Sequence, residues 1–170
     1  MGKTRTGILV CSLLLIGAVV AWAQGRKPGL WEITSTVTLQ QSPLPPGMQM
    51  PASSPLAAGP HTAQVCLTQA MIDKYGAPLP QSSSTECTFS NISKTDHGMT
   101  ADLICSGRMT GKGTVESSWS DPEHAKGTTH FTGTVTTRNG TAPIEWTRDS
   151  TSVFKSADCG DVKPLLPPEK

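Results

Sequence analysis

The sequence predicts a mainly β protein: a single antiparallel curved sheet, barrel or sandwich of about seven or eight strands, with one short helix. Apolar and polar residues alternate along several short segments, as they do on half-buried strands. Turn-forming Gly, Pro, Asn and Asp residues separate these segments. Because the segments follow one another as hairpins, we expect antiparallel pairing.

The first expected strand, Leu30–Leu39, follows a turn signal at Lys27-Pro28-Gly29. Its apolar residues, which alternate with Glu and Thr, are Trp31, Ile33, Val37 and Leu39. The next segment, 40–60, contains six prolines and little charge. Since proline at that density is excluded from helix interiors and central strands, we expect a long extended or mobile loop.

A strand at 63–67 leads into the expected helix, Gln69–Tyr75. Thr68 before it is typical of a helix N-cap, and Gly76 after it is typical of a C-cap. A loop over 78–84 follows. Two strands, Thr85–Lys94 and Met99–Ser106, are then expected to form a hairpin about Asp96-His97-Gly98.

The last third of the chain is rich in threonine and glycine. The strands expected there are 113–119, 124–138, 141–148 and 150–156. Asn139-Gly140 is the strongest two-residue hairpin signal in the chain, and Pro143 weakens the start of the strand after it. Residues 163–170 contain three prolines and are expected to be a disordered tail.

The N-terminus has the order of a secretory signal peptide: a basic start, an apolar run and a small-residue cleavage site. These parts are Lys3 and Arg5, the run 7–20, and Ala21-Trp22-Ala23. The run is short for a bilayer-spanning helix, which needs roughly 20 residues, so an uncleaved anchor is the less favoured alternative. We therefore expect cleavage after Ala23, one β-rich domain over 24–162, and a location in the periplasm or outside the cell.

The cleaved chain is expected to be nearly neutral, with 12 basic and 13 acidic residues. It contains no basic run, so there is no electrostatic case for nucleic acid or an anionic membrane surface as a partner. No second apolar segment is long enough to cross a membrane.

Four cysteines remain after cleavage: Cys66, Cys87, Cys105 and Cys159. An even count in an oxidising compartment indicates disulfides, although spacing alone leaves three pairings open. The expected hairpin places Cys87 opposite Cys105, at a separation that a disulfide can bridge. Cys66–Cys159 is then the remaining pair. The alternative, a metal site of Cys and His, lacks the short ligand spacings that zinc sites show.

Three features of the chain occur together in one known family. They are Lys27-Pro28-Gly29-Leu30-Trp31-Glu32 directly after the signal peptide, the four spaced cysteines, and the closing Ala157-Asp158-Cys159-Gly160. With these residues the chain resembles the bacterial family catalogued as domain of unknown function 3617, over about 27–161. The resemblance implies an exported, periplasmic bacterial protein. It brings no catalytic residue, ligand or reaction.

The sequence offers no catalytic motif, and we expect neither an enzyme nor a cofactor. A polar turn explains the closely spaced Asp121, Glu123 and His124 better than an active site does. Periplasmic copper handling is the alternative function, because thioether and imidazole ligands suit Cu(I). Its weak candidate ligands are Met48, Met50 and His61. The competing interpretation is that both methionines are apolar groups of a loop that docks on the sheet.

The leading hypothesis is non-catalytic binding of a small apolar ligand or an envelope partner. A curved sheet leaves a concave face where such ligands bind. Trp31, Trp119 and Trp146 lie on separate expected strands and are candidate ligand-lining residues, although tryptophan is more often a core residue. The proline-rich loop is then a cover over the site, a docking strand for a partner, or only a surface tether.

Overall fold

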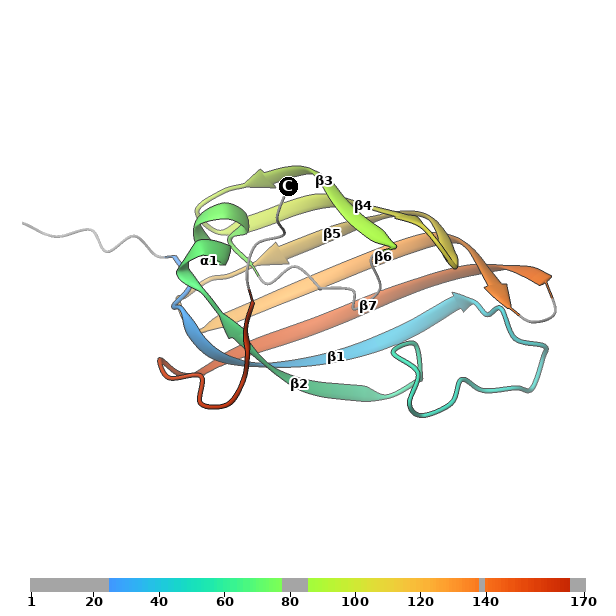
Figure 1. The fold of residues 1–170 in the computed structure, drawn as a ribbon, viewed down its shortest axis with the longest axis horizontal. Helices are drawn as coiled ribbons and strands as arrows, with labels where there is room; N and C mark the ends of the chain where they lie inside the picture. The colour runs from blue at the N-terminus through green and yellow to red at the C-terminus, as the bar shows by residue number, and fades with distance from the viewer. Residues whose placement is uncertain (1–24, 78–85, 138–139, 166–170) are drawn as a thin grey trace, which may run out of the picture.

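The computed structural model describes residues 25–77, 86–137 and 140–165, which form one eight-stranded sheet and one helix (Figure 1). The strands are β1 (Gly29–Gln41), β2 (Pro60–Leu67), β3 (Cys87–Lys94), β4 (Gly98–Ser106), β5 (Met109–Ser118), β6 (His124–Thr137), β7 (Gly140–Ser156) and β8 (Pro164–Leu165); the helix is α1 (Gln69–Tyr75). The predicted mainly β fold with one short helix is confirmed. The expected signal peptide (1–23) and the loop at 78–84 lie outside the described residues.

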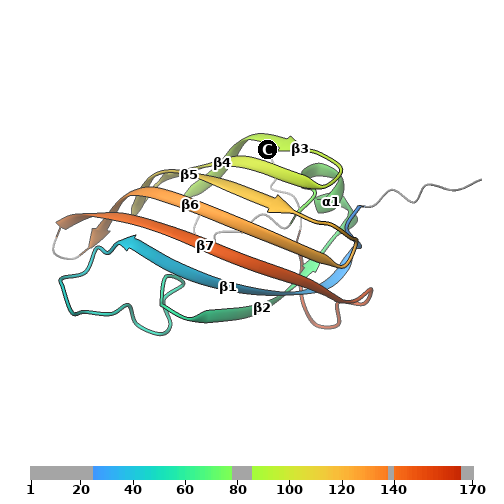
Figure 2. The same cartoon turned by 180° about the vertical axis from the view of Figure 1, so that it is seen from behind.

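The sheet has the strand order β3-β4-β5-β6-β7-β1-β2-β8 and curls into a half-barrel (Figures 1 and 2). Neighbouring strands are antiparallel throughout, except that β8 runs parallel to β2. Helix α1 lies at one end of the half-barrel, and the loop between β1 and β2 lies at the other. These two elements therefore cover opposite ends of the sheet.

One row of side chains crosses the concave face through six neighbouring strands. In register order the row is Phe89, Leu103, Gly113, Phe131, Trp146 and Leu39. A second row, two residues along each strand, is Ala101, Val115, Thr129, Arg148 and Val37. Leu103, Phe131 and Trp146 are buried in the first row, and every member of the second row is buried except the half-buried Arg148. The alternation in sequence thus places an apolar core on one face of the sheet.

Helix α1 closes one end of the concave face. Its bounds and both caps are as predicted: the Thr68 side chain accepts a hydrogen bond from Met71 N, and Gly76 is left-handed with φ 73°. Met71, Ile72 and Tyr75 are buried. The helix therefore adds apolar side chains to a core that the strands alone supply sparsely.

Three glycines, two on β5 and one on β6, leave room for the ring of Phe131 against the sheet. A Cβ on Gly111 would lie 2.8 Å from Phe131 Cζ, and one on Gly133 would lie 3.0 Å from its Cε1. A Cβ on Gly113 would lie 2.1 Å from the His130 carbonyl oxygen. Side chains are excluded there, so the fully buried Phe131 ring fills this part of the concave face.

The observed strands differ from the expected ones mainly in β7, which is continuous from 140 to 156 although two strands were expected there. Pro143 is tolerated because β1 pairs with β7 only as far as Glu145, so Pro143 has a neighbouring strand on one side only. β6 and β7 meet at Thr137 and Gly140. The residues between these strands are therefore 138 and 139, one position before the expected Asn139-Gly140 turn, and they lie outside the described residues.

Two further expectations are corrected at the ends of strands. β1 continues to Gln41 and β2 begins at Pro60, so the proline-rich loop spans 42–59. The tail expected at 163–170 is not wholly irregular, because Pro164–Leu165 forms β8 beside Cys66 and Leu67. Residues 166–170 lie outside the described residues.

The two cysteine pairs that the sequence favoured lie at disulfide distance. Cys87 faces Cys105 across β3 and β4, with Phe89 opposite Leu103, as the hairpin register predicted. Cys66–Cys159 joins β2 to the segment that follows β7, with a Cα–Cα distance of 5.5 Å. One bond thus fastens an edge hairpin, and the other fastens the C-terminal end to β2.

Gly133→Ala is expected to lower the free energy of unfolding by about 2 kcal/mol or more. The added methyl would lie 2.2 Å from the Thr110 carbonyl oxygen, so the strands must separate. Thr132→Ala, at the exposed neighbouring position, is the control and should cost less than about 1 kcal/mol. Urea unfolding measures both, and equal losses would contradict the role assigned to this glycine.

Removal of the Cys66–Cys159 disulfide is expected to destabilise the domain more than removal of Cys87–Cys105. The bonds span 93 and 18 residues of sequence. In the chain-entropy model these spans correspond to about 4.6 and about 3.2 kcal/mol. Denaturant unfolding of the two double Cys→Ser variants tests the order. A greater loss in the Cys87/Cys105 variant would show that loop entropy does not determine the difference.

Candidate ligand-binding pocket

An apolar pocket of about 540 Å³ lies on the concave face at the end opposite α1. The β1–β2 loop supplies one wall, through Leu44, Met50, Pro55 and Leu56. The sheet supplies the other wall, through Phe89, Leu103, Met109, Val135 and Trp146. The volume lies within the range of small-molecule sites, about 300–1,000 Å³, and the lining has their mainly apolar character.

The loop wall contains three hydrogen-bonded turns, so the loop that the sequence predicted is not extended throughout. Met48 N donates to Pro45 O, Ser54 N to Pro51 O, and Ala57 N to Ser54 O. Ala57 is buried and Leu56 packs against the core. Proline limits ladder bonds but permits such local turns, and these place the apolar loop residues against the sheet.

Trp146 lies on the sheet side of the pocket. Its indole stacks on the Phe131 ring with centroids 5.5 Å apart and an interplanar angle of 19°. It is 5% exposed, and its Nε1 has no hydrogen-bond partner. The glycines around Phe131 therefore also position Trp146, through the aromatic stack.

Arg148 brings a positive charge to the same pocket. Its Nη2 donates to the Pro55 carbonyl oxygen of the loop at 2.9 Å, and its guanidinium lies 5.6 Å from the Trp146 ring centroid. Its Nε is buried and has no partner. Burial lowers the pKa of Arg148, and no carboxylate in the described part of the chain forms an ion pair with it.

The other polar groups lie at the pocket rim. Arg108 and Glu86 both line the pocket, and a carboxylate oxygen of Glu86 accepts a hydrogen bond from the backbone N–H of Arg108 at 3.0 Å. Arg108 is exposed, in contrast to Arg148. The lining therefore carries two cations and one anion, with Arg148 on the concave face.

The other two candidate tryptophans do not line this pocket. Trp31 is fully buried, and its Nε1 donates to Lys27 O at 2.9 Å. Arg26 lies 4.0 Å over its ring, and burial lowers the pKa of that arginine to about 10. Trp119 is 4% exposed, and its Nε1 donates to Asp96 O at 2.7 Å. Of the three expected residues, the structure places Trp146 alone at this site.

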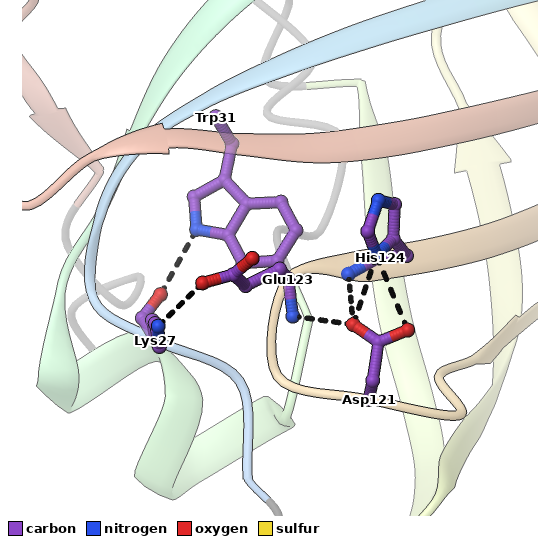
Figure 3. A network of polar contacts seen from close by, with 5 residues as sticks. All are labelled: Lys27, Trp31, Asp121, Glu123 and His124. Atoms are coloured by element: carbon purple, nitrogen blue, oxygen red, sulfur yellow. Dashed lines mark hydrogen bonds and ion pairs between the residues drawn. The ribbon is translucent and has the colours of Figure 1, made fainter.

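Figure 3 shows that the residues around Lys27 and Trp31 hold the start of β1 against the turn before β6. Lys27 forms an ion pair with Glu123. Asp121 accepts hydrogen bonds from the backbone N–H groups of Glu123 and His124. The hydrogen bond from the Glu123 backbone N–H lowers the pKa of Asp121, and the hydrogen bond from the His124 side chain lowers it further. The polar turn expected from the sequence is therefore what these residues form.

The candidate copper ligands have different surroundings. Met48 is 61% exposed, whereas Met50 lines the apolar pocket, and the His61 ring bonds to the Ala57 carbonyl oxygen. Among the described residues, no group of three or more His, Cys, Asp or Glu side chains is placed to hold a metal ion.

Two histidines lie near carboxylates, both at the surface. His124 Nδ1 lies 3.0 Å from Asp121 Oδ1, and His130 Nε2 lies 3.2 Å from Glu145 Oε1. Neither pair lines the apolar pocket.

Sequence reasoning missed Arg148, although the sequence contained a signal for it. Arg148 is two residues after Trp146 on an expected strand, so both side chains belong to the same face. A charged residue on the apolar face of a strand is unfavourable unless it is paired, so its presence there is a signal of a functional role. The loop side of the pocket gave no such signal, because only the fold brings 43–56 beside β7.

A family model described as protein of unknown function (DUF3617) matches residues 26–159. No curated protein and no solved structure matches the chain. In the described part of the chain, no helix is both long enough and apolar enough to span a bilayer.

Proposed function

The chain belongs to the family of proteins of unknown function DUF3617, and we propose that it is an exported, non-catalytic domain that binds a small apolar ligand. The observation that carries this proposal is the pocket between the β1–β2 loop and the concave face. Its apolar walls come from two parts of the chain, and an apolar ligand between them would be removed from water on both sides.

The distribution of apolar side chains favours a small ligand over a protein partner from the envelope. The exposed large apolar residues in the described part of the chain are Met48, Ile104 and Val153, which lie on the loop, β4 and β7. A protein-docking surface needs such residues in one contiguous patch. The loop instead directs Leu44, Met50 and Leu56 into the pocket. No observation favours copper as the ligand.

Export is the second part of the proposal. The two disulfides are compatible with an oxidising compartment, and they support the periplasm as the location. The basic, apolar and Ala-x-Ala order of residues 1–23 supports removal of a signal peptide.

Val135→Trp is expected to weaken binding of the neutral apolar probe N-phenyl-1-naphthylamine by at least about tenfold. Val135 lines the pocket, so the larger side chain occupies ligand volume. Val153→Trp, the same change at a 39% exposed position that does not line this pocket, should bind within about twofold of the parent protein.

Probe fluorescence measures the affinities, and native mass spectrometry of protein purified from its own cells tests for a retained small molecule. Equal binding by the parent and both variants would place the probe elsewhere. If the parent protein neither binds the probe nor retains a small molecule, the proposed function is wrong.

The exported protein is expected to begin at Gln24. Signal peptidase recognises small residues at the two alternate positions before the cut, which are Ala21 and Ala23 here. N-terminal sequencing of protein from the periplasmic fraction measures this. A mature protein that retains Met1 would instead indicate a membrane anchor.

A further inference from the structure

The guanidinium group of Arg148 has an incompletely occupied hydrogen-bonding edge. An arginine side chain carries five N–H donors in a planar fork. In this structure Nη2 donates to the Pro55 carbonyl oxygen at 2.9 Å, while the buried Nε has no partner. The Nε–H and one Nη2–H point in the same direction from one edge of the fork. The Nε–H of this edge is therefore unpaired, and a group with two acceptor atoms can bond to Nε and Nη2 together.

Because of the position of Arg148 in the sheet, its unpaired Nε–H donor is unfavourable in free energy. Its partners across the neighbouring strands are Thr129 on β6 and Val37 on β1, which are 9% and 6% exposed. A partly buried cation without an anion carries an unfavourable desolvation energy, and the same burial lowers the pKa of Arg148. The carboxylate in the pocket lining, Glu86, bonds to the backbone of Arg108.

Apolar side chains line the same pocket as Arg148. Trp146 lies beside the guanidinium, and Met109 and Val135 line the same pocket. The neutral Thr129 hydroxyl oxygen lies on the strand opposite Arg148 and also lines the pocket. A ligand that matches this arrangement has a planar, two-oxygen anionic group at one end and a hydrocarbon chain at the other.

We propose that the ligand is an amphipathic carboxylate, such as a fatty acid, whose carboxylate pairs with Nε and Nη2 of Arg148 while its chain lies in the pocket. This inference rests on the proposed function and names the ligand class. A carboxylate accepts two parallel N–H bonds from an arginine edge, and such charge-assisted pairs are stronger than a bond to a neutral carbonyl.

The test compares dodecanoate with 1-dodecanol, which has the same chain length and no charge, by displacement of N-phenyl-1-naphthylamine at pH 7.5. The carboxyl group is ionised at this pH because its ordinary pKa is near 4 to 5. The parent protein should bind dodecanoate at least about tenfold more tightly than dodecanol. Arg148→Met should lose this preference and bind dodecanol within about threefold of the parent affinity.

Lys112→Met is the control, because Lys112 is an exposed cation on β5 that does not line the pocket. This variant should keep the preference for dodecanoate. Arg148→Lys keeps the charge but lacks the two-donor edge, so its preference should fall between those of the parent and Arg148→Met. The lysine variant also decides the question if the methionine variant does not fold.

The outcomes separate the two proposals. Equal affinities of the parent protein for dodecanoate and dodecanol would overturn the carboxylate assignment and leave the apolar-ligand function standing. An unchanged preference in Arg148→Lys and Arg148→Met would also overturn it. If neither compound displaces the probe and the parent protein does not bind the probe, the proposed function itself fails.

Discussion

Close packing of the Phe131 ring against Gly111, Gly113 and Gly133 sets the geometry on which the concave face depends. A side chain at any of these glycines would collide with neighbouring backbone or with the ring. The close approach of β5 and β6 therefore depends on the absence of a Cβ at these positions. Phe131 then covers the exposed backbone and stacks on Trp146, which lines the pocket. A change at any of these glycines would thus alter both the core and the proposed binding surface, although none of the three lines the pocket.

The half-barrel needs different closures at its two ends. At one end α1 covers the core with the buried side chains of Met71, Ile72 and Tyr75. At the other end the loop of residues 42–59 supplies a wall that is held by local turns, by the packing of Leu56 and by one hydrogen bond from Arg148. The turns of this loop bond within the loop, and the side chains of Arg148 and His61 join its carbonyl groups to the sheet. The proposed binding pocket lies at this end, which the loop closes.

Local signals in the sequence predicted those parts of the fold that depend on neighbouring residues. The hairpin register that pairs Cys87 with Cys105 follows from strands joined by a short turn, and the caps of α1 follow from Thr68 and Gly76. β7 was divided wrongly into 141–148 and 150–156. Pro143, expected to weaken the start of the first of these, is tolerated because β1 ends before it reaches that residue. The pocket could not be predicted, because its walls come from the loop and from strands β3 to β7, whose proximity exists only in the folded chain. The inward position of Arg148 was available from its spacing to Trp146 and was overlooked.

The order of strands in the sheet also constrains the sequence of events during synthesis. β1 is the first strand of the chain, yet it lies between β2 and β7, and its pairing with β7 runs from Leu30↔Ser156 to Gln41↔Glu145. A chain that emerges with its N-terminus first can form the hairpin of β1 and β2 early, but it must wait for the last long strand before the second edge of β1 is covered. Pairing between strands so distant in sequence slows folding, and it leaves one edge of β1 unpaired until β7 has been made. A chain of this topology stays incompletely folded until nearly all of it has emerged, a state that would suit the export proposed above.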